Sequence, residues 1–153
     1  FKPPGKAVPE ALLAKLPGKP PRPTAIFGAH SSANGLDFSR NPAFGHVGEA
    51  FVALFGDMAP GTGKVLGPVG FKVVRVDTRT GVSHDFATNR GDEPGPASLL
   101  RSGGLERPIA VRFDPAGTAL YVVDFGIMNV TDEGPLPREQ SGALWKITRT
   151  GGQ

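Results

Sequence analysis

The chain has 153 residues and a net charge of +3, and its length fits one domain with a buried core. It contains no cysteine, which excludes disulfides and thiolate metal sites but does not decide the compartment. No apolar run of about eighteen residues exists, so no transmembrane segment is expected, and the scattered Lys and Arg residues argue against nucleic acid as a partner.

Residues 1–24 form the first distinct part of the chain, and seven of the first 23 residues are proline. This composition predicts an extended basic connector, with one short helical turn at Pro9–Leu16. The sequence begins at Phe1 without a signal-like apolar core, so we expect either a processed chain or a piece of a longer one.

Seven later segments are typical of β-strands, because they are rich in β-branched and aromatic residues and are bounded by Gly and Pro. Four lie within residues 25–90: Ser32–Phe38, Glu49–Gly56, Phe71–Asp77 and the weaker Ser83–Thr88. Three lie within residues 91–153: Pro108–Asp114, Thr118–Asp124 and Gly142–Thr148. The first part therefore has the strands of a four-stranded meander, and the second part lacks its fourth strand.

The two sets of strands repeat at a drifting period near seventy residues. Gly48 aligns with Gly117 at an offset of 117 − 48 = 69, and Phe71 with Gly142 at 142 − 71 = 71. Phe38 pairs with Phe113 at 75. Repetition of a four-stranded unit with variable loops is typical of a β-propeller.

We therefore predict an all-β fold made of about two blades of a β-propeller, each a four-stranded antiparallel meander. Propellers close with roughly four to eight blades, so this unit is incomplete without further polypeptide. The alternative is an open two-sheet packing that is complete in itself, with only chance similarity between its two hairpins.

The predicted meander places three long loops on one face: Asp57–Gly70, Asn89–Arg107 and Phe125–Ser141. The loop on the opposite face, Pro115 to Gly117, is minimal. Long Gly-rich loops gathered on one face are where a propeller would hold a ligand, although they are also explained as variable surface loops.

The segments GAHSSANGLDF (28–38), GEAFVALFGD (48–57), GFKVVRVD (70–77), GLERPIAVRFDPAGTALYVVDFG (104–126) and SGALWKIT (141–148) follow one another in a distinctive order. Across residues 26–149 this order resembles the C-terminal blades of the glucose/sorbosone dehydrogenase family. The resemblance implies a six-bladed propeller that oxidises sugars with pyrroloquinoline quinone, usually with calcium and outside the cytoplasm. The chain would then be periplasmic or secreted.

The resemblance also implies four cofactor-binding residues on the loop face: Arg107, His30, Lys64 and Asp57. Arg107 precedes an inner strand, where its guanidinium could hold a carboxylate of the quinone in bidentate fashion. A salt bridge from Arg107 to a loop acid such as Glu106 or Asp124 is the simpler alternative. His30 is explained equally well as a hydrogen-bonded surface histidine.

The family's catalytic histidine and most of its calcium ligands belong to early blades, which have no counterpart here. The chain alone is therefore not expected to be an active enzyme, and its expected partners are the remainder of the propeller and a small sugar. It would form one wall of the cofactor and substrate site of a sorbosone-type sugar dehydrogenase. The alternative is a non-catalytic propeller segment that acts as a structural or protein-interaction subunit.

Two further patterns carry no assignment. The segment PGTGK (60–64) is not a phosphate-binding loop, because Met58 and Val65 replace the required glycine and hydroxyl residue. His30, His46 and His84 lack metal-ligand spacing, so no metal ligand is predicted from them.

Overall fold

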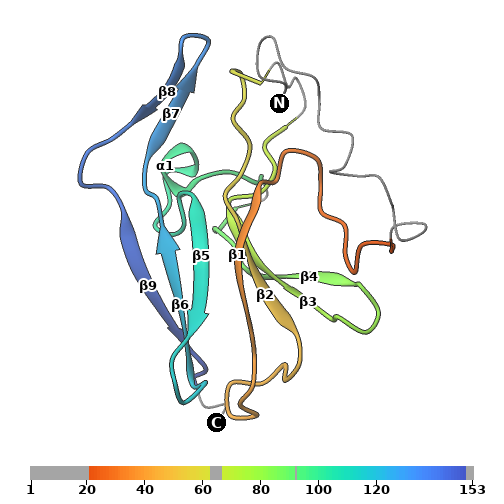
Figure 1. The fold of residues 1–153 in the computed structure, drawn as a ribbon. Helices are drawn as coiled ribbons and strands as arrows, with labels where there is room; N and C mark the ends of the chain where they lie inside the picture. Colours follow the sequence, from red (N-terminus) through yellow and green to blue (C-terminus); the bar gives the residue numbers. More distant parts are fainter. Residues whose placement is uncertain (1–20, 63–66, 92, 151–153) are drawn as a thin grey trace, which may run out of the picture.

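A computed structural model describes residues 21–62, 67–91 and 93–150. The predicted helical turn at Pro9–Leu16 and most of the connector lie outside these residues. The described chain folds into antiparallel sheets of four, three and two strands with one short helix (Figure 1). The all-β class is confirmed, and the sheets are open, as expected for part of a propeller.

The first sheet is a four-stranded meander with its strands in chain order. Its members are β1 (Ala33–Phe38), β2 (Ala50–Leu54), β3 (Lys72–Val76) and β4 (Ser83–Ala87). The four predicted strands are therefore confirmed, each shortened by at most two residues at an end. The short runs of Val, Ala and Phe in β2 and β3 are buried on both faces, which explains why these strands lack a polar side.

The second sheet has three strands, β5 (Pro108–Phe113), β6 (Ala119–Asp124) and β9 (Ala143–Thr148), in the order β5-β6-β9. The three predicted strands are confirmed. The segment expected as a loop between β6 and β9 contains a hairpin, β7 (Met128–Thr131) and β8 (Gly134–Pro137). β8 was not predicted because it contains two prolines. Proline has no main-chain N–H to donate to a neighbouring strand, so it counts against strand formation.

A second difference lies in the loop before β5, which contains one helical turn, α1 (Ala97–Leu100). The Glu106 carboxylate stabilises the turn by accepting hydrogen bonds from the Ser98 main-chain N–H at 2.7 Å and from its hydroxyl at 2.8 Å. Both partners of this contact lie within the Gly/Pro/Ser-rich stretch, whose composition predicted irregular structure. The turn is therefore supported by a contact with Glu106, which composition alone does not reveal.

Strand register fixes how the two sheets correspond. One row of paired residues crosses each sheet at the same place: Phe38, Ala50 and Val76 in the first, and Phe113, Leu120 and Ile147 in the second. The offsets are 113 − 38 = 75, 120 − 50 = 70 and 147 − 76 = 71. Alignment of Gly48 with Gly117 therefore placed the second strand one residue out, which matters because one residue exchanges the two faces of a strand.

The corrected register shows that the sheets stack in a head-to-tail manner. Phe51 and Ala53 of β2 belong to the core cluster between the sheets, whereas Ala50 and Val52 lie on the far face. In the second sheet the residues that face the first are Leu120 and Val122, the counterparts of Ala50 and Val52. Opposite faces thus meet, as between successive blades, whereas a symmetric sandwich of two copies would join equivalent faces.

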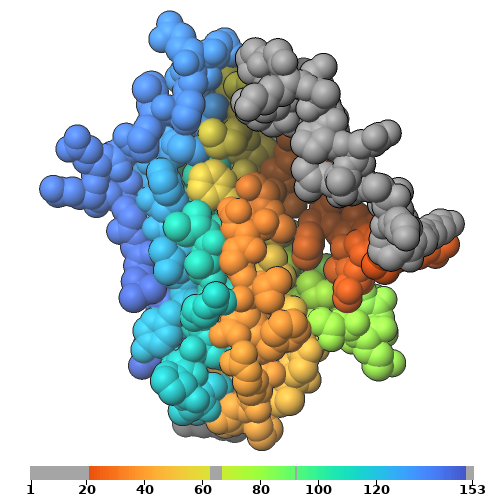
Figure 2. Space-filling view, viewed as in Figure 1, coloured from red at the N-terminus to blue at the C-terminus, as the bar shows by residue number. Residues whose placement is uncertain are grey.

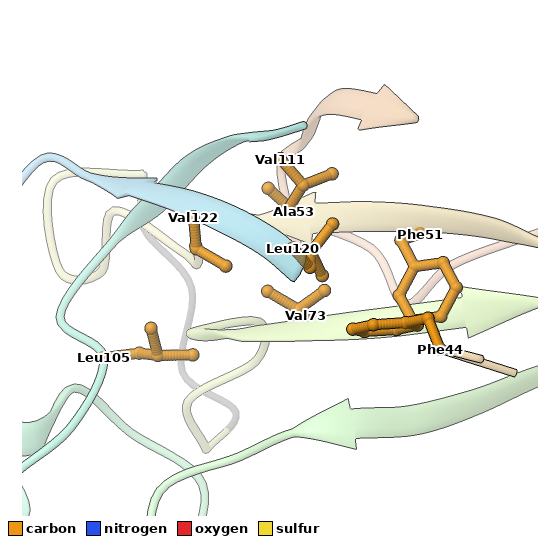
Figure 3. Packing of buried hydrophobic residues seen from close by; sticks show 8 residues of the cluster. All are labelled: Phe44, Phe51, Ala53, Val73, Leu105, Val111, Leu120 and Val122. Atoms are coloured by element: carbon orange, nitrogen blue, oxygen red, sulfur yellow. The ribbon is translucent and has the colours of Figure 1, made fainter. Parts of the chain in front are cut away.

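The core between the sheets is formed by eight buried residues (Figure 3): Phe44, Phe51, Ala53, Val73, Leu105, Val111, Leu120 and Val122. The Phe51 ring makes T-shaped contacts with Phe86 at 4.7 Å and with Phe113 at 5.3 Å between ring centroids. Burial of a Phe, Leu or Val side chain stabilises the folded state by roughly 1.5–3 kcal/mol, so burial of this cluster is the main contribution to the packing of the two sheets.

The inner strands β1 and β5 lie side by side through the middle of the molecule (Figures 1 and 2). The Asp37 carboxylate accepts a hydrogen bond from the Phe113 N–H at 2.9 Å, and Arg112 donates to the Leu36 carbonyl. A Cβ at Gly35 would lie 2.9 Å from the Ala110 Cα, so the close approach of the strands requires glycine there. The far face of the first sheet is packed against Ala25 and Phe27.

Candidate functional site

The loops predicted to share one face lie at the same end of the two sheets, together with α1 and the β7–β8 hairpin (Figure 1). At this loop end β2 finishes, β3 begins and β5 begins. The side chain that joins these three points is Arg107, the first residue before β5. It is 4 % exposed.

The Arg107 guanidinium lies between two aromatic rings of the first sheet. Its central carbon is 5.0 Å from the ring centroid of Phe55, which follows β2, and 5.0 Å from that of Phe71, which precedes β3. Nη1 donates a hydrogen bond of 2.9 Å to the main-chain carbonyl of Asp57. Nε is buried and has no hydrogen-bond partner among the described residues. Nε belongs to the Nε–Nη2 edge of the guanidinium, which is an edge that can bind a carboxylate in bidentate fashion.

Burial lowers the pKa of Arg107, and the negative charges of Asp57 and Glu106 act in the opposite direction. A guanidinium stays protonated despite such shifts, because its ordinary pKa lies far above physiological pH. The loop end therefore holds a permanent buried positive charge.

The main chain at Arg107 is positioned by the carboxylate of Asp124, the last residue of β6. Asp124 is 3 % exposed and accepts hydrogen bonds from the main-chain N–H groups of Glu106 and Arg107, each at 2.8 Å. It also accepts from the Gly126 N–H at 3.0 Å and from the Trp145 indole at 3.3 Å. The Phe125 N–H donates to the Arg107 carbonyl at 2.9 Å. One carboxylate thus fixes the start of β5, the end of β6 and the indole on β9.

The loop before Arg107 is closed by Asn89. The Asn89 amide nitrogen donates to the carbonyls of Gly95 at 2.9 Å and Leu105 at 2.7 Å, and its oxygen accepts from the Leu105 N–H at 2.8 Å. These bonds tie together the two ends of the 89–105 segment. Arg107 therefore starts from a fixed backbone position.

Asp57 is also buried, at 6 % exposure, and its carboxylate accepts hydrogen bonds from the N–H groups of Val69 at 2.7 Å and Ala59 at 3.2 Å. These bonds tie together the two ends of the loop that follows β2. The Asp57 side chain supports this loop, while its carbonyl orients the Arg107 guanidinium. The structure therefore brings Arg107 and Asp57 together.

The other two predicted cofactor residues stand apart from this pair. His30 is exposed, in a turn before β1 with φ of +66°. The adjacent Ser31 carbonyl accepts a hydrogen bond from the Gly56 N–H at 3.0 Å, which brings the turn to the same loop end. Lys64 lies outside the described residues.

An open groove adjoins the Arg107 cluster on the side of the inner strands. It has a volume of about 550 Å³ and is lined by Ser32, Asn34, Gly35, Phe55 and Ile109. The Phe55 ring is shared, because it lines the groove and also stacks on the Arg107 guanidinium. A ligand in this groove would meet one aromatic ring, a hydroxyl and an amide, with the buried positive charge behind the ring.

Residues 21–62, 67–91 and 93–150 contain no group of three or more His, Asp or Glu side chains placed to hold a metal ion. Within these ranges no helix is long and apolar enough to cross a membrane. The described part of the site thus offers a cation, aromatic rings and hydrogen-bonding groups.

No protein-family model, no curated protein and no solved structure matches the chain. Proposals about its function therefore rest on its own residues and geometry.

Proposed function

We propose that the chain is the C-terminal part of a quinone-dependent sugar dehydrogenase of the sorbosone type. In this proposal it forms one wall of the cofactor and substrate site, and other polypeptide supplies the remaining blades. The observation that supports it is Arg107, a buried guanidinium at the loop end of two consecutive blades whose Nε has no partner among the described residues. The head-to-tail order of the two sheets supports the propeller part of the proposal.

The donor set fits a cofactor that carries carboxylates. Arg107 would hold one carboxylate through Nε and Nη2, and the Asp57 carbonyl keeps the guanidinium in orientation through Nη1. His30 and Lys64 remain proposed contacts of the same site. When bound, pyrroloquinoline quinone would supply the redox chemistry that accepts the hydride of the sugar. Calcium, if it accompanies the quinone, would be held by the blades that other polypeptide provides, and the assembly would be periplasmic or secreted.

A second candidate function is favoured by the burial of Arg107. The guanidinium is 4 % exposed and already contacts Phe55, Phe71 and the Asp57 carbonyl, so it stabilises the junction of the two sheets without a ligand. A non-catalytic propeller segment with a structural or protein-interaction role would keep these contacts. It would need no quinone.

Quinone binding by the completed assembly separates the two candidates. The chain is isolated from its source under native conditions, its mass is measured by native mass spectrometry, and the complex is titrated with pyrroloquinoline quinone by calorimetry. The dehydrogenase proposal predicts saturable binding, and Arg107→Ala weakens it by about 1–3 kcal/mol, as expected for loss of a charge-assisted contact. The matched control is Arg138→Ala, an exposed arginine on the β7–β8 side, which leaves the affinity unchanged.

Thermal unfolding of both variants without quinone shows how much of the effect comes from stability alone. Quinone affinity that is unchanged in a folded Arg107→Ala assembly would remove Arg107 from the cofactor site. A complete assembly that binds no quinone and shows no sugar-dependent dye reduction would support the non-catalytic candidate.

A further inference from the structure

The outer edge of β9 differs from the edge of its counterpart in the first sheet. In register, β9 corresponds to β3, which pairs with β2 on one side and with β4 on the other. Within the described residues β9 pairs only with β6. The second sheet therefore has an open edge at the place where the first sheet has its fourth strand.

Hydrogen-bond directions identify the main-chain groups at this edge. The Ala119 carbonyl accepts from the Asp114 N–H at 2.9 Å, so Ala119 directs its main chain toward β5. Because direction alternates along a strand, Leu120 and Val122 face β9, where they pair with Ile147 and Trp145. The residues that lie between these in β9 therefore direct their main-chain N–H and C=O groups away from β6.

Leu144 and Lys146 are therefore the residues that direct their N–H and C=O groups to the open edge. Their counterparts Val73 and Arg75 pair with Ala87 and His84 of β4. An unpaired strand edge of this kind binds an added strand through main-chain hydrogen bonds.

Apolar side chains next to this edge are uncovered. Leu144 is 64 % exposed and its cross-strand neighbour Val123 is 41 % exposed. Their counterparts Val73 and Ala53 are both at 0 % exposure. In the first sheet this face is covered by the second sheet and by Phe86 of β4, which stacks on Phe51 at 4.7 Å.

The counterpart of Phe51 is Tyr121, which adjoins Val123 on the outer face of the second sheet. An aromatic residue at the Phe86 position of an added strand would therefore pack on Tyr121. Lys146 provides charge complementarity, because its counterpart Arg75 is paired with Glu49 at 2.7 Å, whereas the residue equivalent to Glu49 in the second sheet is Ala119. An acidic residue at the His84 position would neutralise Lys146.

The sequence that leads out of β9 is similar to the turn that leads into β4, but it is displaced by one residue. Residues 78–81 and residues 148–151 both read Thr-Arg-Thr-Gly at an offset of 148 − 78 = 70, whereas the paired strands give 147 − 76 = 71, so the sequence position that corresponds to Gly81 is Gly152. In the first repeat this turn is closed by the Asp77 carbonyl, which accepts from the N–H groups of Thr80 at 3.3 Å and Gly81 at 2.7 Å. Gly81 has a φ of +77°, a conformation that favours glycine.

We infer that the open edge of β9 binds a fourth antiparallel strand of β4 type, with an aromatic residue over Tyr121 and an acidic residue beside Lys146. The inference rests on the propeller part of the proposed function and not on the cofactor site. It identifies the nearest partner of the chain as an extended segment of β4 type. Its test uses no quinone, so its failure is distinguishable from failure of the dehydrogenase proposal.

The test extends the chain by a copy of the sequence of residues 82–89 placed directly after Gly152, with the copied His84 changed to Glu, so that this position lies opposite Lys146 as His84 lies opposite Arg75. Amide hydrogen exchange is measured by NMR on the original and extended chains. We expect exchange at Leu144 and Lys146 to slow by about ten-fold or more in the extended chain, because their N–H groups gain strand partners. The thermal midpoint should also rise, because Leu144 and Val123 lose exposure.

The control extension has the same length and composition, but its copied Phe is exchanged with the preceding Asp, which occupies the opposite face of β4, so that the aromatic side chain points away from Tyr121. A second control places Lys146→Pro in the chain with the first extension, because proline removes one edge N–H and is tolerated on an edge strand. Both controls should lose most of the protection at Leu144, while exchange in β2 stays unchanged and reports an intact first sheet. Unchanged exchange at Leu144 and Lys146 in the first extension, with β2 still protected, would overturn the inference.

Discussion

The guanidinium of Arg107 and the main-chain carbonyl of Asp57 are joined by a 2.9 Å hydrogen bond across the two sheets. Arg107 immediately precedes β5, and Asp57 follows the second strand of the other sheet. The bond lies at the loop end, where Phe55 and Phe71 enclose the guanidinium. The same side chain that is proposed to hold a ligand therefore also stabilises the junction of the blades.

Replacement of Arg107 should destabilise the chain even without a ligand. A hydrogen bond from a charged group contributes about 1.5–3 kcal/mol, and stacking of a guanidinium on each aromatic ring adds about 0.5–1 kcal/mol. We expect Arg107→Ala to lower the free energy of unfolding by about 2.5–5 kcal/mol. Arg107→Lys should lose less, because it keeps the charge but lacks the planar fork.

Chemical denaturation followed by the fluorescence of Trp145, the single tryptophan, measures both variants. The exposed Arg138→Ala serves as the control and should change stability by less than about 0.5 kcal/mol. Equal stability of Arg107→Ala and Arg138→Ala would show that the stack contributes nothing to the junction of the sheets.

The Asp124 carboxylate offers a second test, because it accepts hydrogen bonds from three main-chain N–H groups and from the Trp145 indole. In Asp124→Asn one oxygen becomes an NH₂ donor that faces N–H groups. We expect a loss of about 2–4 kcal/mol in unfolding free energy, since buried donors lose their acceptor. The matched change Trp145→Phe removes the 3.3 Å indole bond and part of the ring but leaves the three main-chain bonds, and should cost less. Far-UV circular dichroism follows both variants, and a smaller loss in Asp124→Asn than in Trp145→Phe would contradict this role.

Asp37 should make stability depend on acid pH. Burial works to raise the pKa of Asp37, but the N–H groups of Phe113 and Phe38 and the charge of Arg40 outweigh it and hold the pKa below its ordinary value. A lowered folded-state pKa means that the stabilisation is complete above the unfolded pKa of about 3.9 and is lost as pH falls through the folded value.

Asp37→Asn should therefore be less stable than the original chain near neutral pH and lose less stability as pH falls below about 4. Denaturant titrations at a series of pH values measure the difference. The exposed Asp132→Asn is the control and should keep the slope of the original chain. An Asp37→Asn chain with an unchanged acid slope would mean that the contact with Phe113 does not favour the ionised form.

The strands of both sheets could be predicted from sequence, because runs such as FKVVRVD and ALYVVD combine β-branched and aromatic residues between turn signals. The face that each strand presents could not. Gly48 and Gly117 align well in sequence, yet the register of Phe113 with Leu120 shows that the true offset is 70. Two registers that differ by one residue are distinguished only by which residues pair across the strands. The register in turn decides which face of each strand meets the other sheet, and so whether the sheets stack head to tail.

The position of Arg107 before an inner strand was predictable, but its surroundings were not. Phe55 and Phe71 belong to the other sheet, and the Asp57 contact uses a main-chain carbonyl that has no residue-type signal. Asp124 was one of the loop acids named as an alternative salt-bridge partner of Arg107, and its carboxylate accepts the main-chain N–H of that residue. A Phe-Gly pair follows both β2 and β6, and this repeat could have indicated that the two strand ends meet. Phe55 and Phe125 do contact each other, at 5.9 Å between ring centroids.

The glycines of these two pairs give the last test. Gly56 and Gly126 follow the second strands of the two sheets, with φ of +98° and +95°. A Cβ at Gly56 would overlap the Phe71 ring, and a Cβ at Gly126 would overlap the main chain at Ser141. Both positions combine a conformation unfavourable for alanine with a steric clash, so each Gly→Ala change should cost more than about 1 kcal/mol.

Gly126→Ala should be the more damaging of the two, because the main chain at Ser141 yields less readily than a phenyl ring. Gly103→Ala is the control, since a Cβ there meets no atom within 4 Å. Thermal unfolding ranks the three variants. In Gly56→Ala the Phe71 ring must also move relative to Arg107, so quinone titration of the completed assembly adds a second measurement. If Gly56→Ala changes stability no more than Gly103→Ala, the Phe71 ring is free to move, and the guanidinium is more accessible to a ligand than its 4 % exposure indicates.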